Sequence, residues 1–235
     1  MELSPDRKLL PITPMLLTPP EAELFFKLHK SLMFFVNQQL HVLPNIDSIK
    51  KYSRLRPNAR MKVHRAFLDE IDLIEKFIDE NPFAFSDDEL DVVHSWHHLE
   101  SGQFLIFREL KKYTVFLSIE KRPIAYGVLA LTEPFEDLVG PYLPVLTETT
   151  LLPFRDKIIY DGLLNSFNLS FGGEYRRSFK DNYNSAKRRW GIVTTLPAVE
   201  ARPAVTKHAA SKPSKHQKRG QASSRRGIKR GRVAL

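Results

Sequence analysis

The spacing of apolar residues changes near Gly102, and this change constrains the possible fold more than any other feature of the sequence. Before it, apolar side chains recur every three or four residues, which is typical of amphipathic helices. After it, short runs rich in β-branched and aromatic residues are separated by turn residues, which is typical of strands. These strands follow one another too closely to be joined by crossover helices. The sequence therefore predicts an α+β protein: N-terminal helices, a central antiparallel β-meander or small barrel, one C-terminal helix and a disordered basic tail.

Three helices are predicted before this change. Thr18 is a suitable N-cap for the first, because the two prolines that follow it fit a first helical turn. The second helix is predicted over about Asn58–Asp79. The third begins at Ser86, where Glu89 completes a capping box, and is predicted to end near Gly102.

Five or six strands and a last helix are predicted after the change. Lys111-Lys112 indicates a hairpin between the first two strands, and a helix follows Gly172-Gly173 over about Glu174–Trp190. Ile192–Leu196 is a candidate closing strand. The strands are predicted at residues 104–110, 113–119, 124–131, 145–152, 157–160 and 167–171.

The chain divides into four segments. Residues 1–17 are predicted to be a loose lead-in, 18–102 a helical region, 103–197 the sheet with its C-terminal helix, and 198–235 the tail. We expect the two middle segments to form one globule, because about 200 residues are enough for a sizeable apolar core.

Composition excludes several protein classes. The chain has no cysteine, which rules out disulfides, thiolate catalysis and cysteine-ligated zinc or iron–sulfur sites. No apolar run approaches the roughly 20 residues of a membrane-spanning helix, and the first residues lack a signal-peptide pattern. We therefore expect a cytoplasmic protein with no membrane partner, and no motif predicts a cofactor.

Positive charge is concentrated in residues 198–235. They hold 11 of the 36 lysines and arginines but only one acid, Glu200, so their net charge is +10. The remaining 25 basic and 26 acidic residues give residues 1–197 a net charge of −1. Such a tail has too little apolar content to fold alone, but it binds RNA or DNA through phosphates without reading sequence. The predicted contacts are Lys212, Lys215, Lys218, Arg219, Arg225, Arg226, Lys229, Arg230 and Arg232.

The last predicted helix provides a second basic surface. Its apolar residues form one stripe that is expected to pack on the sheet, which leaves its positive side chains in solvent. We expect these side chains to add nucleic-acid contacts to those of the tail. They are Arg176, Arg177, Lys180 and Arg188.

The Gly172-Gly173 step is the best candidate for an anion site in the body. A strand–Gly-Gly–helix step can expose backbone N–H groups at the positive end of a helix, and Arg176 and Arg177 follow closely. Glu174 in the first turn and the lack of a P-loop lysine argue against a phosphate site. The alternative is a tight turn that needs glycine for a positive φ, with solvated arginines.

His94 and His98 are the best candidates for a metal site. The two histidines are four residues apart on one predicted helix. Their rings would therefore share a face with Asp91, as a zinc site needs. The alternative is that the aspartates complement the helix N-terminus and that the histidines are exposed or pack beside Trp96. Since there is no HExxH pattern, a metal is not the favoured interpretation.

Asp161 is a weak catalytic candidate. Tyr160-Asp161-Gly162 is more typical of a turn than of a catalytic element, because Asp-Gly is a strong turn signal. A general base at Asp161 would need a partner that the sequence does not place.

Two further stretches resemble a known family. The residues LLPFRDKIIYDGLL (151–164) and FGGEYRRSFKDNYNSAKRRWGIVTTLP (171–197) resemble an uncharacterised bacterial family that shares LPFxxxIIYDGL, a Gly-Gly step, RRS and GIxTLP. The resemblance covers roughly residues 18–197 and leaves the tail outside. It implies kinship and no particular activity.

Two functions are compatible with these features. The first is a non-enzymatic binding module whose basic tail contacts nucleic acid or another polyanion, with a protein partner of unknown kind. The alternative is a small enzyme or phosphate- or nucleotide-binding protein with a site near Gly172-Gly173 or near His94 and His98. The first is favoured because it needs only features that the sequence shows.

Overall fold

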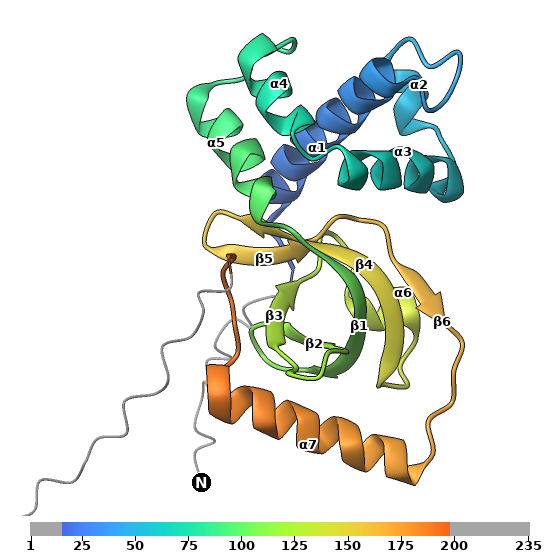
Figure 1. The fold of residues 1–235 in the computed structure, drawn as a ribbon, viewed down its shortest axis with the longest axis vertical. Helices are drawn as coiled ribbons and strands as arrows, with labels where there is room; N and C mark the ends of the chain where they lie inside the picture. The colour runs from blue at the N-terminus through green and yellow to red at the C-terminus, as the bar shows by residue number, and fades with distance from the viewer. Residues whose placement is uncertain (1–15, 198–235) are drawn as a thin grey trace, which may run out of the picture. The chain divides into compact units, whose positions relative to one another are not determined.

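The structure is a computed structural model that describes residues 16–197, so the tail and nearly all of the lead-in lie outside it. N-terminal helices, a six-stranded sheet and a C-terminal helix follow one another along the chain (Figure 1). This arrangement confirms the predicted α+β class. Among the described residues, no helix has both the length and the apolar character needed to cross a membrane.

The first helix begins where its cap predicts. Helix α1 (Pro19–Leu40) follows Thr18, whose backbone N–H donates to the Glu21 carboxylate at 3.0 Å. The helix then runs through the centre of the helical region (Figure 1). It buries one side completely, including Phe25, Leu28, Leu32 and Val36.

The predicted second helix is two helices, so this prediction is wrong. Helix α3 (Pro57–Asp69) ends at Glu70, whose φ of −130° and ψ of 53° leave the helical region, and α4 (Leu73–Glu80) begins three residues later. The break lets α3 and α4 pack on different parts of α1 (Figure 1). A further short helix that the sequence did not predict, α2 (Ile49–Ser53), precedes them.

The third predicted helix begins at its capping box but ends early. Helix α5 (Asp87–Ser95) starts after Ser86, whose N–H donates to Glu89 at 3.2 Å. The 3₁₀ turn η1 (Trp96–His98) then leads directly into strand β1. Trp96 fixes this exit, because its buried indole N–H donates to the Pro153 carbonyl at 3.1 Å.

The sheet closes into a small barrel. The strand order is β1-β2-β3-β5-β4-β6, and β1 also pairs with β4, which closes a ring of five strands. All pairings are antiparallel except β3 with β5, so the sheet is mixed where the sequence predicted an antiparallel one. The reason is that β4 pairs beside β1, which leaves β5 to fill the gap next to β3. The strands are β1 Glu100–Glu109, β2 Thr114–Ser118, β3 Ala125–Leu129, β4 Val145–Phe154, β5 Lys157–Tyr160 and β6 Asn165–Phe167.

Alternate residues of the strands face two different cores. Phe104, Ile106 and Phe116 point to the large core that the barrel shares with the helical region. Their neighbours Leu105 and Val115 point outward, to a second core under helix α7 (Gly173–Trp190). This period of two is that of a strand with both faces covered. The helical region therefore covers one side of the barrel and α7 another (Figure 1).

Helix α7 packs on the outer face of the barrel, and fewer of its apolar residues take part in this contact than predicted. Tyr183 and Ala186 are buried there, whereas Tyr175, an aromatic residue that was expected to pack on the sheet with the other apolar residues of this helix, is exposed. After the helix, the predicted closing strand is a single bridge between Val193 and Tyr126. The short helix α6 (Phe135–Val139) connects β3 to β4.

Candidate functional site

The outer side of α7 carries a basic stripe. Arg176, Lys180 and Lys187 share one side of the helix, because they are four and seven residues apart, and Arg177 and Arg188 lie next to them on the neighbouring side. All five side chains are exposed. The stripe borders the apolar side of α7 that packs on the barrel. The four residues that the sequence singled out on this helix therefore lie together, with Lys187 as an addition.

Barrel residues extend this stripe. The guanidinium of Arg176 donates to the carbonyl oxygens of Phe171 at 3.1 Å and Leu143 at 3.4 Å. Arg108 of β1 lies over the ring of Tyr183, 5.4 Å from its centroid. These contacts join the basic side of α7 to the start of β4 and the end of β1.

Two exposed tyrosines lie at the same end of α7. Tyr142 is 85% exposed and immediately precedes Leu143, whose carbonyl accepts from Arg176. Tyr175 is 65% exposed and precedes Arg176 in the helix. Exposed aromatic rings beside arginines are the components of a surface on which unpaired bases stack.

The Gly172-Gly173 step has no cradle. Gly172 is the N-cap of α7 and has an extended backbone, with a φ of −67° and a ψ of 172°. The positive φ expected of a tight turn is therefore not present. A Cβ added to either glycine would meet no atom within 4 Å. The step is therefore open surface, and the guanidinium of Arg176 is held by the carbonyls of Phe171 and Leu143.

The helix that was to bring His94 and His98 onto one face ends before His98. The 3₁₀ turn places His97 beside His94 instead, with their ring centroids 5.5 Å apart. Oε1 of Glu75 lies 3.4 Å from Nε2 of His94 and 2.8 Å from Nε2 of His97. Glu75 and His94 are more than half exposed, so this cluster of Glu75, His94 and His97 is open to solvent.

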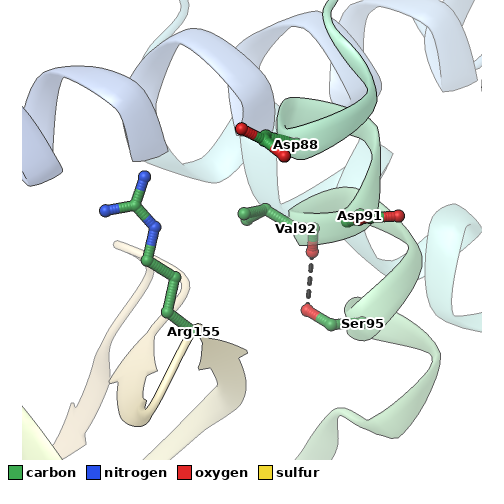
Figure 2. Close-up of a pocket in the computed structure, with 5 residues that line it drawn as sticks. All are labelled: Asp88, Asp91, Val92, Ser95 and Arg155. Carbon is green, nitrogen blue, oxygen red and sulfur yellow. Dashed lines mark hydrogen bonds between the residues drawn. The ribbon is translucent and has the colours of Figure 1, made fainter.

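Asp91 is not part of that cluster and lines an open hollow beside α5. The hollow has a volume of about 310 Å³ and is lined by Asp88, Asp91, Val92, Ser95 and Arg155. Figure 2 shows Arg155 rising from the β4–β5 turn towards α5, whereas Asp91 points away from it. The only hydrogen bond drawn there is internal to α5, from the Ser95 hydroxyl to the Val92 carbonyl at 2.6 Å.

A buried polar cluster lies where the helical region meets the barrel. His64 of α3 and Asp161, which follows β5, are 4% and 3% exposed. Nε2 of His64 is 3.2 Å from Oδ2 of Asp161. His64 is therefore the partner of Asp161 that the sequence did not place.

Hydroxyl groups of β4 and β1 complete this cluster. Nε2 of His64 lies 2.9 Å from the Thr150 hydroxyl, which donates to the hydroxyl of exposed Ser101 at 2.9 Å. The other carboxylate oxygen of Asp161, Oδ1, accepts the Leu163 N–H at 3.0 Å. A chain of polar groups therefore runs from Asp161 to the surface.

His29 of α1 is the third ionisable group at this place. One ring nitrogen of His29, one of His64 and one carboxylate oxygen of Asp161 all lie within 4.8 Å of one another. Burial lowers the pKa of His29 to about 3, and electrostatic repulsion from neighbouring basic groups, Arg60 and Lys30 among them, acts in the same direction. At neutral pH His29 is therefore an uncharged imidazole.

The environment of Asp161 has opposing effects on its charge. Burial raises the pKa of the Asp161 carboxyl above its usual range. His64 and the hydrogen bonds from Leu163 N–H and the Thr149 hydroxyl act to lower it. Perturbed buried groups of this kind are more common at functional sites than elsewhere.

Two small cavities meet at this cluster, and several polar atoms there make no hydrogen bond. Each cavity has a volume of about 30 Å³, and Asp161 lines both, with His64 in one and His29 and Arg60 in the other. A space of this size holds a water molecule or a small ion. Nδ1 of His64, Oδ2 of Asp161 and Nε of Arg60 are buried without a hydrogen bond.

Sequence reasoning missed this cluster because its members come from distant parts of the chain. Asp161 was singled out, but as a turn residue, and neither His29 nor His64 belongs to a recognisable motif. The one available signal was position: His64 follows the inward-facing Val63 on its predicted helix, and His29 follows the core residue Leu28.

Comparison of the chain with protein-family models, with curated proteins and with solved structures finds no match. The resemblance of residues 151–164 and 171–197 to an uncharacterised bacterial family therefore stays a prediction. Both the basic stripe and the buried cluster have to be interpreted from their own geometry.

Proposed function

We propose that this protein binds single-stranded nucleic acid non-enzymatically, on the outer side of α7 and through its basic tail. The observation that supports the proposal is the exposed stripe of Arg176, Arg177, Lys180, Lys187 and Arg188. The stripe provides phosphate contacts, and Tyr142 and Tyr175 at one end of it provide rings for unpaired bases.

The topology of the barrel gives weaker support. Five strands closed into a barrel, with β1 paired to both β2 and β4, resemble the five-stranded barrels that bind oligonucleotides. Such barrels bind their ligands around the outer face of strands 2 and 3. A fold alone does not determine a function, so the argument rests on the side chains of α7.

The position of α7 changes where a ligand would bind on this barrel. The outward residues Val115 and Leu117 of β2 are buried in the core under α7. The usual binding face is therefore closed, and α7 presents the exposed surface in its place. Since residues 1–197 have a net charge of −1, binding depends on this local stripe and on the tail rather than on the overall charge of the body.

Charge reversal on α7 in the full chain tests the proposal. The variant Arg177→Glu/Lys180→Glu/Arg188→Glu is expected to bind single-stranded RNA and DNA at least tenfold more weakly. The slope of log affinity against log salt is expected to fall by about 2, since each lost phosphate contact removes roughly 0.7 for a single strand. Fluorescence anisotropy at several salt concentrations measures both quantities.

The matched control is Lys50→Glu/Arg54→Glu/Lys62→Glu, which reverses three exposed basic residues of the helical region. It changes the net charge by the same amount as the α7 variant but is expected to leave the slope within about 1 of the unmodified chain, because only generalised repulsion is added. If the α7 variant and this control bind alike, then α7 is not a binding surface. Removal of residues 198–235 measures the contribution of the tail separately.

A further inference from the structure

We propose that His29, His64 and Asp161 bind a divalent transition-metal ion between the helical region and the barrel. The site is independent of the nucleic-acid surface on α7. Two imidazoles and one carboxylate form a ligand set that suits Zn²⁺ or Fe²⁺ and leaves further coordination positions open.

The three ligands converge from three separate elements. His29 belongs to α1, His64 to α3, and Asp161 follows β5, yet one donor atom of each lies within 4.8 Å of the other two. Neighbouring ligands of a bound Zn²⁺ or Fe²⁺ are roughly 3 Å apart, given metal–ligand distances near 2.1 Å. The 3.2 Å between Nε2 of His64 and Oδ2 of Asp161 has this spacing already.

Unpartnered atoms at the cluster are the second observation. Oδ2 of Asp161 is buried and makes no hydrogen bond, although it lies 3.2 Å from Nε2 of His64. A buried carboxylate oxygen without a hydrogen bond destabilises a fold, so such atoms are uncommon without a ligand. A metal would use Oδ2 of Asp161, Nε2 of His64 and one ring nitrogen of His29.

The surroundings supply the outer contacts that a metal site needs. Ligating groups are usually held by further hydrogen bonds. Oδ1 of Asp161 is held by Leu163 N–H and the Thr149 hydroxyl. These contacts leave Oδ2 of Asp161 as the oxygen available to a metal.

Nearby positive charges restrict which form of the ion can bind. Arg60 and Lys30 line the same cavity as His29 and Asp161. One carboxylate does not neutralise a divalent ion, so these cations oppose a bare metal. An oxygen anion such as hydroxide in an open position would offset them, and Arg60, whose Nε is buried without a hydrogen bond, lines the same cavity. We therefore expect binding to be tighter when hydroxide or another small oxyanion can enter.

Metal binding by the full chain tests the inference. The exposed cluster of Glu75, His94 and His97 is first removed by Glu75→Gln/His94→Gln/His97→Gln, because it would also bind metal adventitiously. This variant is expected to fold, since Glu75 and His94 are exposed. Stripped of metal and then dialysed against Zn²⁺ or anaerobic Fe²⁺, it is expected to retain one equivalent by elemental analysis. Mg²⁺ is expected not to be retained, because it prefers oxygen ligands.

Two measurements separate a metal site from a structural histidine–aspartate pair. Co²⁺ is expected to give a d–d absorption band in the surface-cluster variant, and this band is expected to be lost when His29→Gln is added. Thermal unfolding with excess Zn²⁺ is expected to shift upward by several degrees only while the three ligands are intact. A surface-cluster variant that retains no metal and gives neither a Co²⁺ band nor a thermal shift would show that the pair is structural.

Discussion

The barrel is covered on two sides, and the two contacts differ in chemistry. Under α7 the contact is apolar, formed by residues such as Leu105, Val115 and Ala186. Under the helical region the contact is also largely apolar, but it encloses His64 and Asp161. An apolar contact is explained by the stability it provides, roughly 25 cal/mol for each Å² removed from water.

The polar contact has no such explanation. Burying a histidine and a carboxylate is unfavourable unless every polar atom is satisfied, and here several are not. A packing of apolar residues would hold the helical region to the barrel equally well. Packing alone therefore accounts for the α7 contact but not for the cluster at the other contact.

The largest effect is expected from breaking the buried pair. In metal-free protein, His64→Leu leaves Asp161 buried without its partner and is expected to lower the free energy of unfolding by about 3–5 kcal/mol. The double variant His64→Leu/Asp161→Leu is expected to be more stable than the sum of the single changes by about 2–3 kcal/mol, because it buries no lone charge. Urea unfolding in a chelating buffer measures all four states.

The matched pair under α7 is Phe107 and Tyr183, whose rings are 5.0 Å apart. Changing both to leucine is expected to give a coupling of no more than about 1 kcal/mol, as for other aromatic pairs. Equal coupling at the two contacts would remove the distinction between them.

The sequence predicts the parts of this fold that depend on local chemistry. The caps at Thr18 and Ser86 are where helices begin, and Lys111-Lys112 turns between β1 and β2. Each of these features is decided by residues within one turn of the chain. Helix starts can be predicted from capping residues, and strands from the spacing of apolar residues, without knowledge of distant contacts.

The parts that failed depend on contacts between distant residues. Nothing marks the break between α3 and α4, because residues 70–72 contain neither proline nor glycine. The closure of the barrel by β1 and β4, and with it the parallel β3–β5 pair, follows from which strands meet in space. The buried cluster depends on the helix break and on the closure of the barrel. His64 of α3 lies beside the end of β5 only when α3 ends before α4 and the barrel is closed.

An intermediate effect is expected at the α7 side of the barrel. Gly127 of β3 lies against the ring of Tyr113, and a Cβ there would be 2.9 Å from two ring carbons. Gly127→Ala is expected to lower the free energy of unfolding by roughly 2–3 kcal/mol, because β3 is bonded on both sides and cannot shift. Urea unfolding of the variant gives this value directly.

Gly173→Ala is the control, since a Cβ there meets nothing within 4 Å. It is expected to be neutral or to stabilise by up to about 1 kcal/mol, because alanine restricts the unfolded chain. Adding Tyr113→Ala to Gly127→Ala removes the ring that the new Cβ would meet. The double variant is therefore expected to regain no more of the free energy of unfolding than the clash with this ring costs. A Gly127→Ala variant as stable as the unmodified chain would show that the ring of Tyr113 moves freely.

The smallest effect is expected at the rim of the polar contact, where Glu21 of α1 forms an ion pair with Lys157 of β5. Burial opposes the charge of Glu21, but hydrogen bonds from Lys157 and Thr18 outweigh it and lower the pKa of Glu21 to about 2. A carboxyl whose pKa is lower in the folded than in the unfolded state stabilises the fold above the unfolded value, near pH 4.5, and this contribution is lost as the pH falls towards 2. Glu21→Gln is therefore expected to lower the free energy of unfolding by about 1–2 kcal/mol at pH 7. The difference from the unmodified chain is expected to shrink steadily below pH 5.

The control is Asp47→Asn, which removes the exposed Asp47–Lys51 pair of one helical turn. Solvent screens that pair, so no measurable change in the free energy of unfolding is expected at pH 7 or at pH 3. Urea unfolding of the three proteins between pH 7 and pH 3 distinguishes the two ion pairs. If Glu21→Gln cost as much at pH 3 as at pH 7, its effect would come from lost packing at the start of α1 rather than from charge.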